Sequence, residues 1–122
     1  MKRIFLFLLL IFLNTSYSFC AEINFKKDTF EKAQKEGKTV VINSWNKYCG
    51  TCIRQEKVFK QARNDFKDVL FLTFEQNNKK IANLLNIDYR STIVVYKNNK
   101  EVARAIGIVS KDKIYSLIKA GI

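Results

Sequence analysis

The stretch TVVINSWNKYCGTC, residues 39–52, runs from a strand-like segment into two cysteines at the start of a predicted helix. Residues 39–42 are β-branched and continuous, which is typical of a strand covered on both faces. Cys49 and Cys52 follow and open a helix predicted over residues 53–66. A helix N-terminus presents unpaired backbone N–H groups and a positive dipole end, so it lowers the pKa of a thiol placed there. This placement predicts thiol chemistry for the pair.

The spacing of the two cysteines gives them different predicted roles. Two intervening residues place Cys52 one helical turn from Cys49, close enough to form a small disulfide ring. Thiolates attack disulfides, so Cys49 is predicted to capture a partner's sulfur and Cys52 to release it. A purely structural disulfide is the alternative, but a two-residue loop provides little chain-entropy stabilisation.

The first twenty residues have the composition of a secretory signal peptide. A basic start at residues 1–3 precedes an uninterrupted apolar run of ten residues, 4–13, and a small, polar-leaning segment that ends at Ala21. This run is too short to span a bilayer, which takes about twenty apolar residues. We therefore expect a signal peptide over residues 1–20, one domain over residues 21–122, and a periplasmic or secreted product.

Export affects how the cysteines are interpreted. In an oxidising compartment an exposed cysteine pair is a disulfide unless electrons are supplied to it. The cleavage position is open between Ser16 and Cys20, and with it the fate of Cys20. Lipid attachment to Cys20 is disfavoured because the bulky Phe19 precedes it.

The chain is strongly basic. It carries 22 basic and 11 acidic residues, a formal net charge of +11. The lysines are scattered, mostly opposite apolar helix positions, and no aromatic-interleaved basic motif accompanies them. We therefore expect a solvated surface and no nucleic-acid partner. Weak attraction to acidic partners or to an anionic membrane stays open.

The remaining patterns predict a single α/β domain with a mixed sheet. A second continuous apolar run, residues 69–74, follows the cysteine helix, and two such strands around one helix make a βαβ unit. Asp28 is predicted to cap an earlier helix that ends at Gly37. The other expected elements are a weak strand near residues 23–25, a short helix with Ile81, Leu84 and Leu85 on one face, a tight hairpin of residues 93–96 and 101–106 around two asparagines, and a final helix from about Ser110.

Residues 45–52, with an aromatic directly before the first cysteine, resemble the active-site signature of the thioredoxin superfamily. Residues 37–42 and 100–107 also look like the family's corresponding segments, and the likeness runs from about Ile23 to the C-terminus. The resemblance implies a thioredoxin-like fold, three α/β/α layers around a mixed central sheet. Exported bacterial thioredoxin-like domains are its nearest type.

The resemblance also implies a catalytic set. Cys49 would be the nucleophile and Cys52 the resolving cysteine of a redox-active disulfide that needs no cofactor. Disulfide-containing proteins would be the substrates of a monomer, with a membrane-embedded thiol reductase as electron donor. The residues implied for the substrate groove are Trp45, Tyr48, Gly50, Thr51, Ser91 and Thr92.

Three departures from the family pattern concern residues around the cysteines. Asn43 stands where the family has a buried acid, so proton transfer at Cys52 is expected to differ. Ser91 stands at the family's cis-proline position, and a trans bond after Arg90 is expected because a cis bond without proline costs about 3 kcal/mol. The Gly-Thr dipeptide between the cysteines lacks the histidine of strong oxidants. Only the helix end, helped by Lys47 and Arg54, is left to stabilise a thiolate, which favours a reductase.

Two other function classes stay open from the sequence. A metal or iron–sulfur module normally needs four ligands, and this chain offers the motif pair, the doubtful Cys20 and no histidine, so a dimer would have to pool two pairs. No metal site is predicted in one chain. Alternatively, Asn43 and Ser91 suggest a binding protein with a thioredoxin-like groove and no catalysis.

Overall fold

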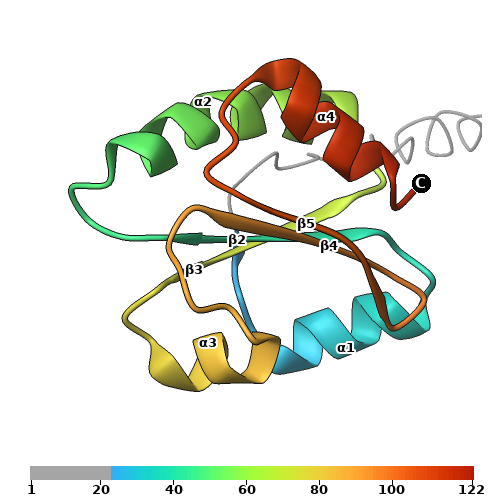
Figure 1. The fold of residues 1–122 in the computed structure, drawn as a ribbon. Helices are drawn as coiled ribbons and strands as arrows, with labels where there is room; N and C mark the ends of the chain where they lie inside the picture. Colours follow the sequence, from blue (N-terminus) through green and yellow to red (C-terminus); the bar gives the residue numbers. More distant parts are fainter. Residues whose placement is uncertain (1–22) are drawn as a thin grey trace, which may run out of the picture.

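The computed structural model describes residues 23–122, which form a five-stranded sheet with helices on both faces (Figure 1). The predicted signal peptide and Cys20 lie outside these residues. The strands are β1 (Ile23–Asn24), β2 (Val40–Trp45), β3 (Leu70–Glu75), β4 (Thr92–Lys97) and β5 (Lys100–Ile106). The helices are α1 (Lys27–Lys35), α2 (Gly50–Asp65), α3 (Lys79–Leu85) and α4 (Lys111–Lys119).

The sheet is mixed, as the sequence predicted, and β2 lies at its centre. The strand order is β1-β3-β2-β4-β5. β2 pairs in parallel with β3 and antiparallel with β4, while β4 and β5 form an antiparallel hairpin. Val40, Val41 and Ile42 are at most 1% exposed, because helices cover both faces of this strand.

Two separate cores fill the two sides of the sheet. Val40 and Ile42 of β2 belong to one core, and Val41 between them belongs to the other, because successive side chains of a strand point to opposite faces. In Figure 1, α2 and α4 cover one face and α1 and α3 the other. The predicted three-layer α/β/α arrangement is thereby confirmed.

Two local predictions are confirmed by the backbone. Asn98 and Asn99 both have positive φ, 52° and 63°, so the β4–β5 connection is a tight turn of the kind that asparagine tolerates. The described residues contain no cis peptide bond, so the bond between Arg90 and Ser91 is trans.

Three predicted helix details are wrong. Asp28 is not a cap: α1 begins at Lys27 after Lys26, whose side chain makes no cap hydrogen bond, and Asp28 lies in the first turn, where its charge still suits the helix dipole. Leu84 is 49% exposed, because the buried face of the short α3 is formed by Ala82 and Leu85. Helix α2 begins at Gly50 rather than at Ile53, so Cys52 lies inside its first turn.

Within residues 23–122, no helix combines the length and the apolar character needed to cross a bilayer.

Candidate functional site

Cys49 occupies the N-cap position of α2. Its backbone is extended, with φ −94° and ψ 102°, and the backbone N–H of Cys52 donates a hydrogen bond to its Sγ at 3.2 Å. The two cysteines form a disulfide with their Cα atoms 5.2 Å apart. A sulfur at this position accepts one of the otherwise unpaired N–H groups of the helix end, so a thiolate on Cys49 is stabilised there.

Ser91 lies directly against both sulfurs. Its Oγ is 3.4 Å from Cys49 Sγ and 3.2 Å from Cys52 Sγ. All three residues are buried: Cys49 is 2%, Cys52 7% and Ser91 5% exposed. The Ser91 backbone is in the left-handed region, with φ 64°, which only glycine adopts freely.

Three hydrogen bonds fix the backbone of Ser91. Its N–H donates to the carbonyl of Ser44 at 2.9 Å, and its carbonyl accepts from the N–H of Gly107 at 3.0 Å. That carbonyl also accepts from Nε2 of Gln55 at 3.1 Å, and the same amide nitrogen donates to the carbonyl of Ile108 at 2.9 Å. Gln55 is fully buried on α2, so the helix that carries the cysteines is tied directly to Ser91.

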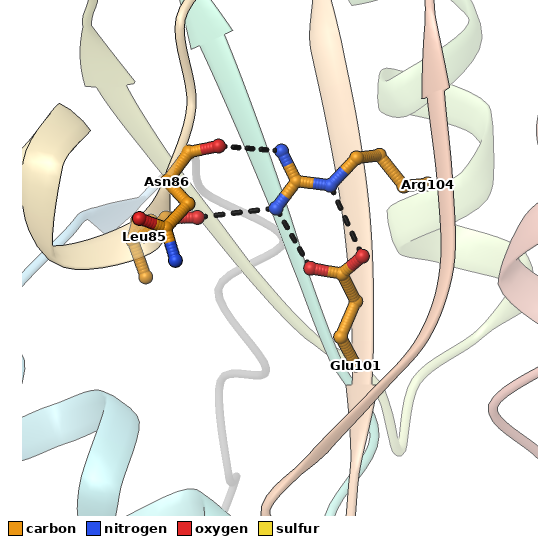
Figure 2. Close-up of polar contacts among 4 residues, drawn as sticks. All are labelled: Leu85, Asn86, Glu101 and Arg104. Atoms are coloured by element: carbon orange, nitrogen blue, oxygen red, sulfur yellow. Dashed lines mark hydrogen bonds and ion pairs between the residues drawn. The ribbon is translucent and has the colours of Figure 1, made fainter.

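The chain that leads from α3 to Ser91 is anchored at several points. Figure 2 shows the Arg104 guanidinium of β5 donating to the carbonyls of Asn86 at 2.8 Å and Leu85 at 3.1 Å. Its Nε and Nη2 also pair with the Glu101 carboxylate, at 3.1 and 2.7 Å. Nε2 of Gln76 donates to the carbonyl of Ile87 at 2.9 Å. These bonds give hydrogen-bond donors to the carbonyl groups at and just after the end of α3, and they hold residues 85–87 in place.

A cavity of about 450 Å³ adjoins the cysteines. Four of the predicted site residues line it together with Cys49 and Cys52: Asn43, Trp45, Lys47 and Tyr48. Tyr48 is fully exposed beside the buried Cys49, with φ 61°. An exposed aromatic side chain and a disulfide therefore share one surface depression.

The other predicted groove residues lie elsewhere. Gly50 is exposed and Thr51 half-buried in the first turn of α2. Thr92 is 1% exposed, and its hydroxyl donates to the Tyr89 carbonyl at 2.6 Å rather than to a sulfur. Ser91 contacts the sulfurs and does not line the cavity.

Two residues of α2 that the sequence pattern does not single out contribute to the site. Gln55 positions Ser91, as described above. Glu56 lines the same cavity as Asn43 and Cys52, and its Oε1 pairs with Arg63 at 2.7 Å. The sequence could have indicated Glu56 by its spacing, because a residue four positions after Cys52 lies on the same face of a helix.

The described residues include no group of three or more His, Cys, Asp or Glu side chains arranged to hold a metal ion.

Known proteins with similar sequences include thioredoxins. The sequence model of the thioredoxin family, described as Thioredoxin, matches residues 21–120. A thioredoxin of Mycoplasma genitalium is 36% identical over 81 residues, which is 66% of this chain and 79% of that protein. The chloroplastic F-type thioredoxin of Pisum sativum is 31% identical over 100 residues, 79% of this chain and 54% of the relative. The chain thus spans about half the length of such chloroplast relatives.

Solved structures agree in fold. The crystal structure of Trxlp from Edwardsiella tarda superposes with a TM-score of 0.75 at 22% identity, covering 80% of this chain and 98% of that one. The short form of spinach chloroplast thioredoxin F gives a TM-score of 0.69 at 29% identity, covering 82% and 92%. With the family model spanning almost all of the described residues and the cysteine pair at the start of α2, the chain belongs to the thioredoxin family.

Proposed function

We propose that this protein is an exported thiol–disulfide oxidoreductase that reduces disulfides in partner proteins. Thioredoxins exchange disulfides through a redox-active cysteine pair without a cofactor, and Cys49 and Cys52 are such a pair. The single observation that carries the proposal is the position of Cys49 Sγ at the N-cap of α2, within 3.2 Å of a backbone N–H.

The exchange transfers two electrons. The Cys49 thiolate attacks a sulfur of the partner's disulfide, forming a mixed disulfide and releasing the partner's other sulfur as a thiolate that takes up a proton. Cys52 then loses its proton and attacks Cys49 Sγ. The Cys49–Cys52 bond forms, the bond to the partner breaks, and the partner leaves with both cysteines reduced.

The proposed reducing direction needs an electron supply outside the cytoplasm. The predicted signal peptide over residues 1–20 supports export to the periplasm or beyond. There the donor would be the dithiol of a membrane-embedded thiol reductase, which reduces the Cys49–Cys52 disulfide by the same exchange. The absence of histidine between the cysteines supports the reducing direction, and the protein would act as a monomer on disulfide-containing proteins.

An insulin-reduction assay with dithiothreitol as electron source tests the activity. We expect the wild-type protein to accelerate reduction and Cys49→Ser to abolish the acceleration, because no thiolate then starts the exchange. With the full-length chain, Cys20→Ser is the matched control and should behave as wild type, since Cys20 lies outside the motif. Near-zero activity in both wild type and Cys49→Ser, with a pair that thiol reagents reach, would contradict an oxidoreductase and favour a binding protein.

Trapping tests the substrates and the location. Cys52→Ser should accumulate mixed disulfides on Cys49, because the resolving attack is lost. Expressed with its own N-terminus, the variant should trap exported proteins and one membrane protein with a reactive cysteine pair. Retention of full-length chain in the cytoplasm would overturn the proposed export and leave the exchange chemistry standing.

A further inference from the structure

The hydrogen-bond direction at Ser91 follows from the chemistry of its neighbours. A disulfide sulfur carries no hydrogen, so in the oxidised protein neither Cys49 nor Cys52 can donate to Ser91. The Ser91 hydroxyl is therefore the donor in both sulfur contacts, at 3.4 and 3.2 Å. One O–H is shared between the two sulfurs that carry the redox chemistry.

Reduction strengthens this contact selectively. A thiolate is a much better acceptor than a disulfide sulfur, and a hydrogen bond to a charged group is roughly twice as strong as a neutral one. Cys49 Sγ already accepts the backbone N–H of Cys52, so the Ser91 hydroxyl becomes its second donor. Each donor that prefers the charged form lowers the pKa of the thiol.

The backbone of Ser91 is held in place despite its conformation. A non-glycine residue in the left-handed region costs about 1–2 kcal/mol. The bonds to Ser44, Gly107 and Gln55 fix it there, and its hydroxyl faces the two sulfurs. The anchored backbone places the Ser91 hydroxyl beside the two sulfurs. Strained backbone conformations of this kind are often found at functional sites.

Among residues 23–122, Ser91 provides the side-chain hydrogen bonds to the two sulfurs. Asn43 lines the cavity but makes no hydrogen bond to Cys49 or Cys52. The protein has no histidine that could supply a proton or a positive charge between the cysteines. Ser91 is thus the side-chain donor available to a thiolate at this site.

We propose that Ser91 is a catalytic residue of the exchange: its hydroxyl donates a hydrogen bond to the Cys49 thiolate before attack and to the Cys52 thiolate before resolution. The proposal rests on the thiol–disulfide exchange proposed above. No proton is transferred from Ser91, so the bonds formed and broken stay those of the exchange. The hydroxyl stabilises the reduced form and raises the reduction potential of the pair.

The decisive variant is Ser91→Gly, because glycine accepts φ 64° and lacks only the hydroxymethyl group. We expect the Cys49 pKa to rise by about one unit, a tenfold loss of thiolate at pH values below the wild-type pKa. The pH dependence of iodoacetamide alkylation measures the pKa. At a pH above both pKa values, where the reduced protein carries the Cys49 thiolate, the equilibrium constant with glutathione should shift about tenfold toward the oxidised protein. Ser91→Ala should give the same shifts and controls for the flexibility that glycine adds.

Thr92→Val is the matched control, because it removes the adjacent buried hydroxyl, which bonds the Tyr89 carbonyl and neither sulfur. It should leave the Cys49 pKa at the wild-type value. Circular dichroism verifies that each variant is folded. Folded Ser91→Gly and Ser91→Ala proteins with wild-type pKa and glutathione equilibrium would overturn the proposal. Alkylation needs no partner protein, so that result would leave the proposed reductase function to be judged by the insulin assay alone.

Discussion

Asn43 carries no titratable proton, although it lines the cavity that both cysteines adjoin. Its neighbour across the parallel pair of strands, Thr73, is equally unable to act as a base near neutral pH. Glu56 is a carboxylate on the wall of the same cavity, one helical turn after Cys52. Its Oε1 accepts a hydrogen bond from Nη2 of Arg63 at 2.7 Å, which positions the carboxylate. We predict that this carboxylate accepts the Cys52 proton through a water molecule.

Glu56→Gln should slow the resolving step, on the order of tenfold or more, because the amide cannot accept a proton. Gln keeps a hydrogen bond to Arg63, so the fold should be retained. The rate is measured by stopped-flow fluorescence of Trp45, the single tryptophan of the chain, which lines the cavity.

The double variant Glu56→Gln/Asn43→Asp should recover the rate, since it returns a carboxylate to the same cavity. Glu75→Gln is the control, because Glu75 lies at the end of β3 and pairs with Asn77 outside this cavity. A wild-type resolving rate in Glu56→Gln would show that bulk water accepts the Cys52 proton.

At the scale of elements, the site depends on how β5 holds the end of α3. Figure 2 shows that one guanidinium, Arg104, joins the Leu85 and Asn86 carbonyls to the Glu101 carboxylate. Asn86 ends α3 in the left-handed conformation, and the chain from there to Ser91 has no regular strand or helix. Arg104 thus holds the start of the connection that leads to Ser91, whose own backbone is fixed by Ser44, Gly107 and Gln55.

Arg104→Ala should lower the free energy of unfolding by about 1–2 kcal/mol, because it removes charge-assisted bonds to two helix-end carbonyls. Urea unfolding followed by circular dichroism measures this loss. Amide hydrogen exchange should also accelerate between residues 85 and 91 more than in α2. Unchanged exchange in that segment would mean that the Gln76 bond to Ile87 suffices to hold it.

Glu101→Gln separates the ion pair from the carbonyl bonds. The hydrogen bond from Arg104 lowers the Glu101 pKa, so this pair stabilises the fold above the ordinary carboxyl pKa and ceases to do so as pH falls through the lowered value. The variant should have a lower free energy of unfolding than wild type at neutral pH, and the difference between the two should shrink in acid. Equal differences at both pH values would contradict a contribution from this pair.

At the scale of the whole molecule, positive charge surrounds the cavity. The formal net charge is +11, and Lys47, Lys57 and Lys60 line the cavity beside Glu56. Clefts lined by one sign of charge concentrate partners of the opposite sign and raise association rates. Disulfide substrates with acidic residues beside their cysteines are therefore expected to react faster than basic ones.

The rate constant for a disulfide peptide flanked by glutamates should fall several-fold as ionic strength rises from about 0.01 M to about 0.15 M, where the Debye length shortens from about 30 Å to about 8 Å. A lysine-flanked peptide should show the reverse trend. Lys57→Gln/Lys60→Gln should reduce the salt dependence. Lys35→Gln is the control, because α1 covers the opposite face of the sheet from α2. Identical rates for both peptides at low salt would exclude electrostatic selection.

Much of the fold follows from local patterns in the sequence. The continuous β-branched run at residues 40–42 specifies a central strand. At the edge of a sheet, or in a sheet covered on one face only, some of these apolar side chains would be exposed to water. The paired asparagines specify the hairpin turn through their tolerance of positive φ. Helix ends were less predictable: α1 begins without a side-chain cap, and α3 turns Ala82 rather than Leu84 inward.

The sequence by itself determined the redox pair, because a thiol at a strand-to-helix junction is activated by the helix that follows it, a local effect. Only the tertiary structure decided what surrounds that pair. Ser91 reaches the sulfurs across 42 and 39 residues because β4 pairs antiparallel with β2, and Gln55 meets Ser91 across 36. Contacts of this separation depend on strand order and register, which no local pattern encodes.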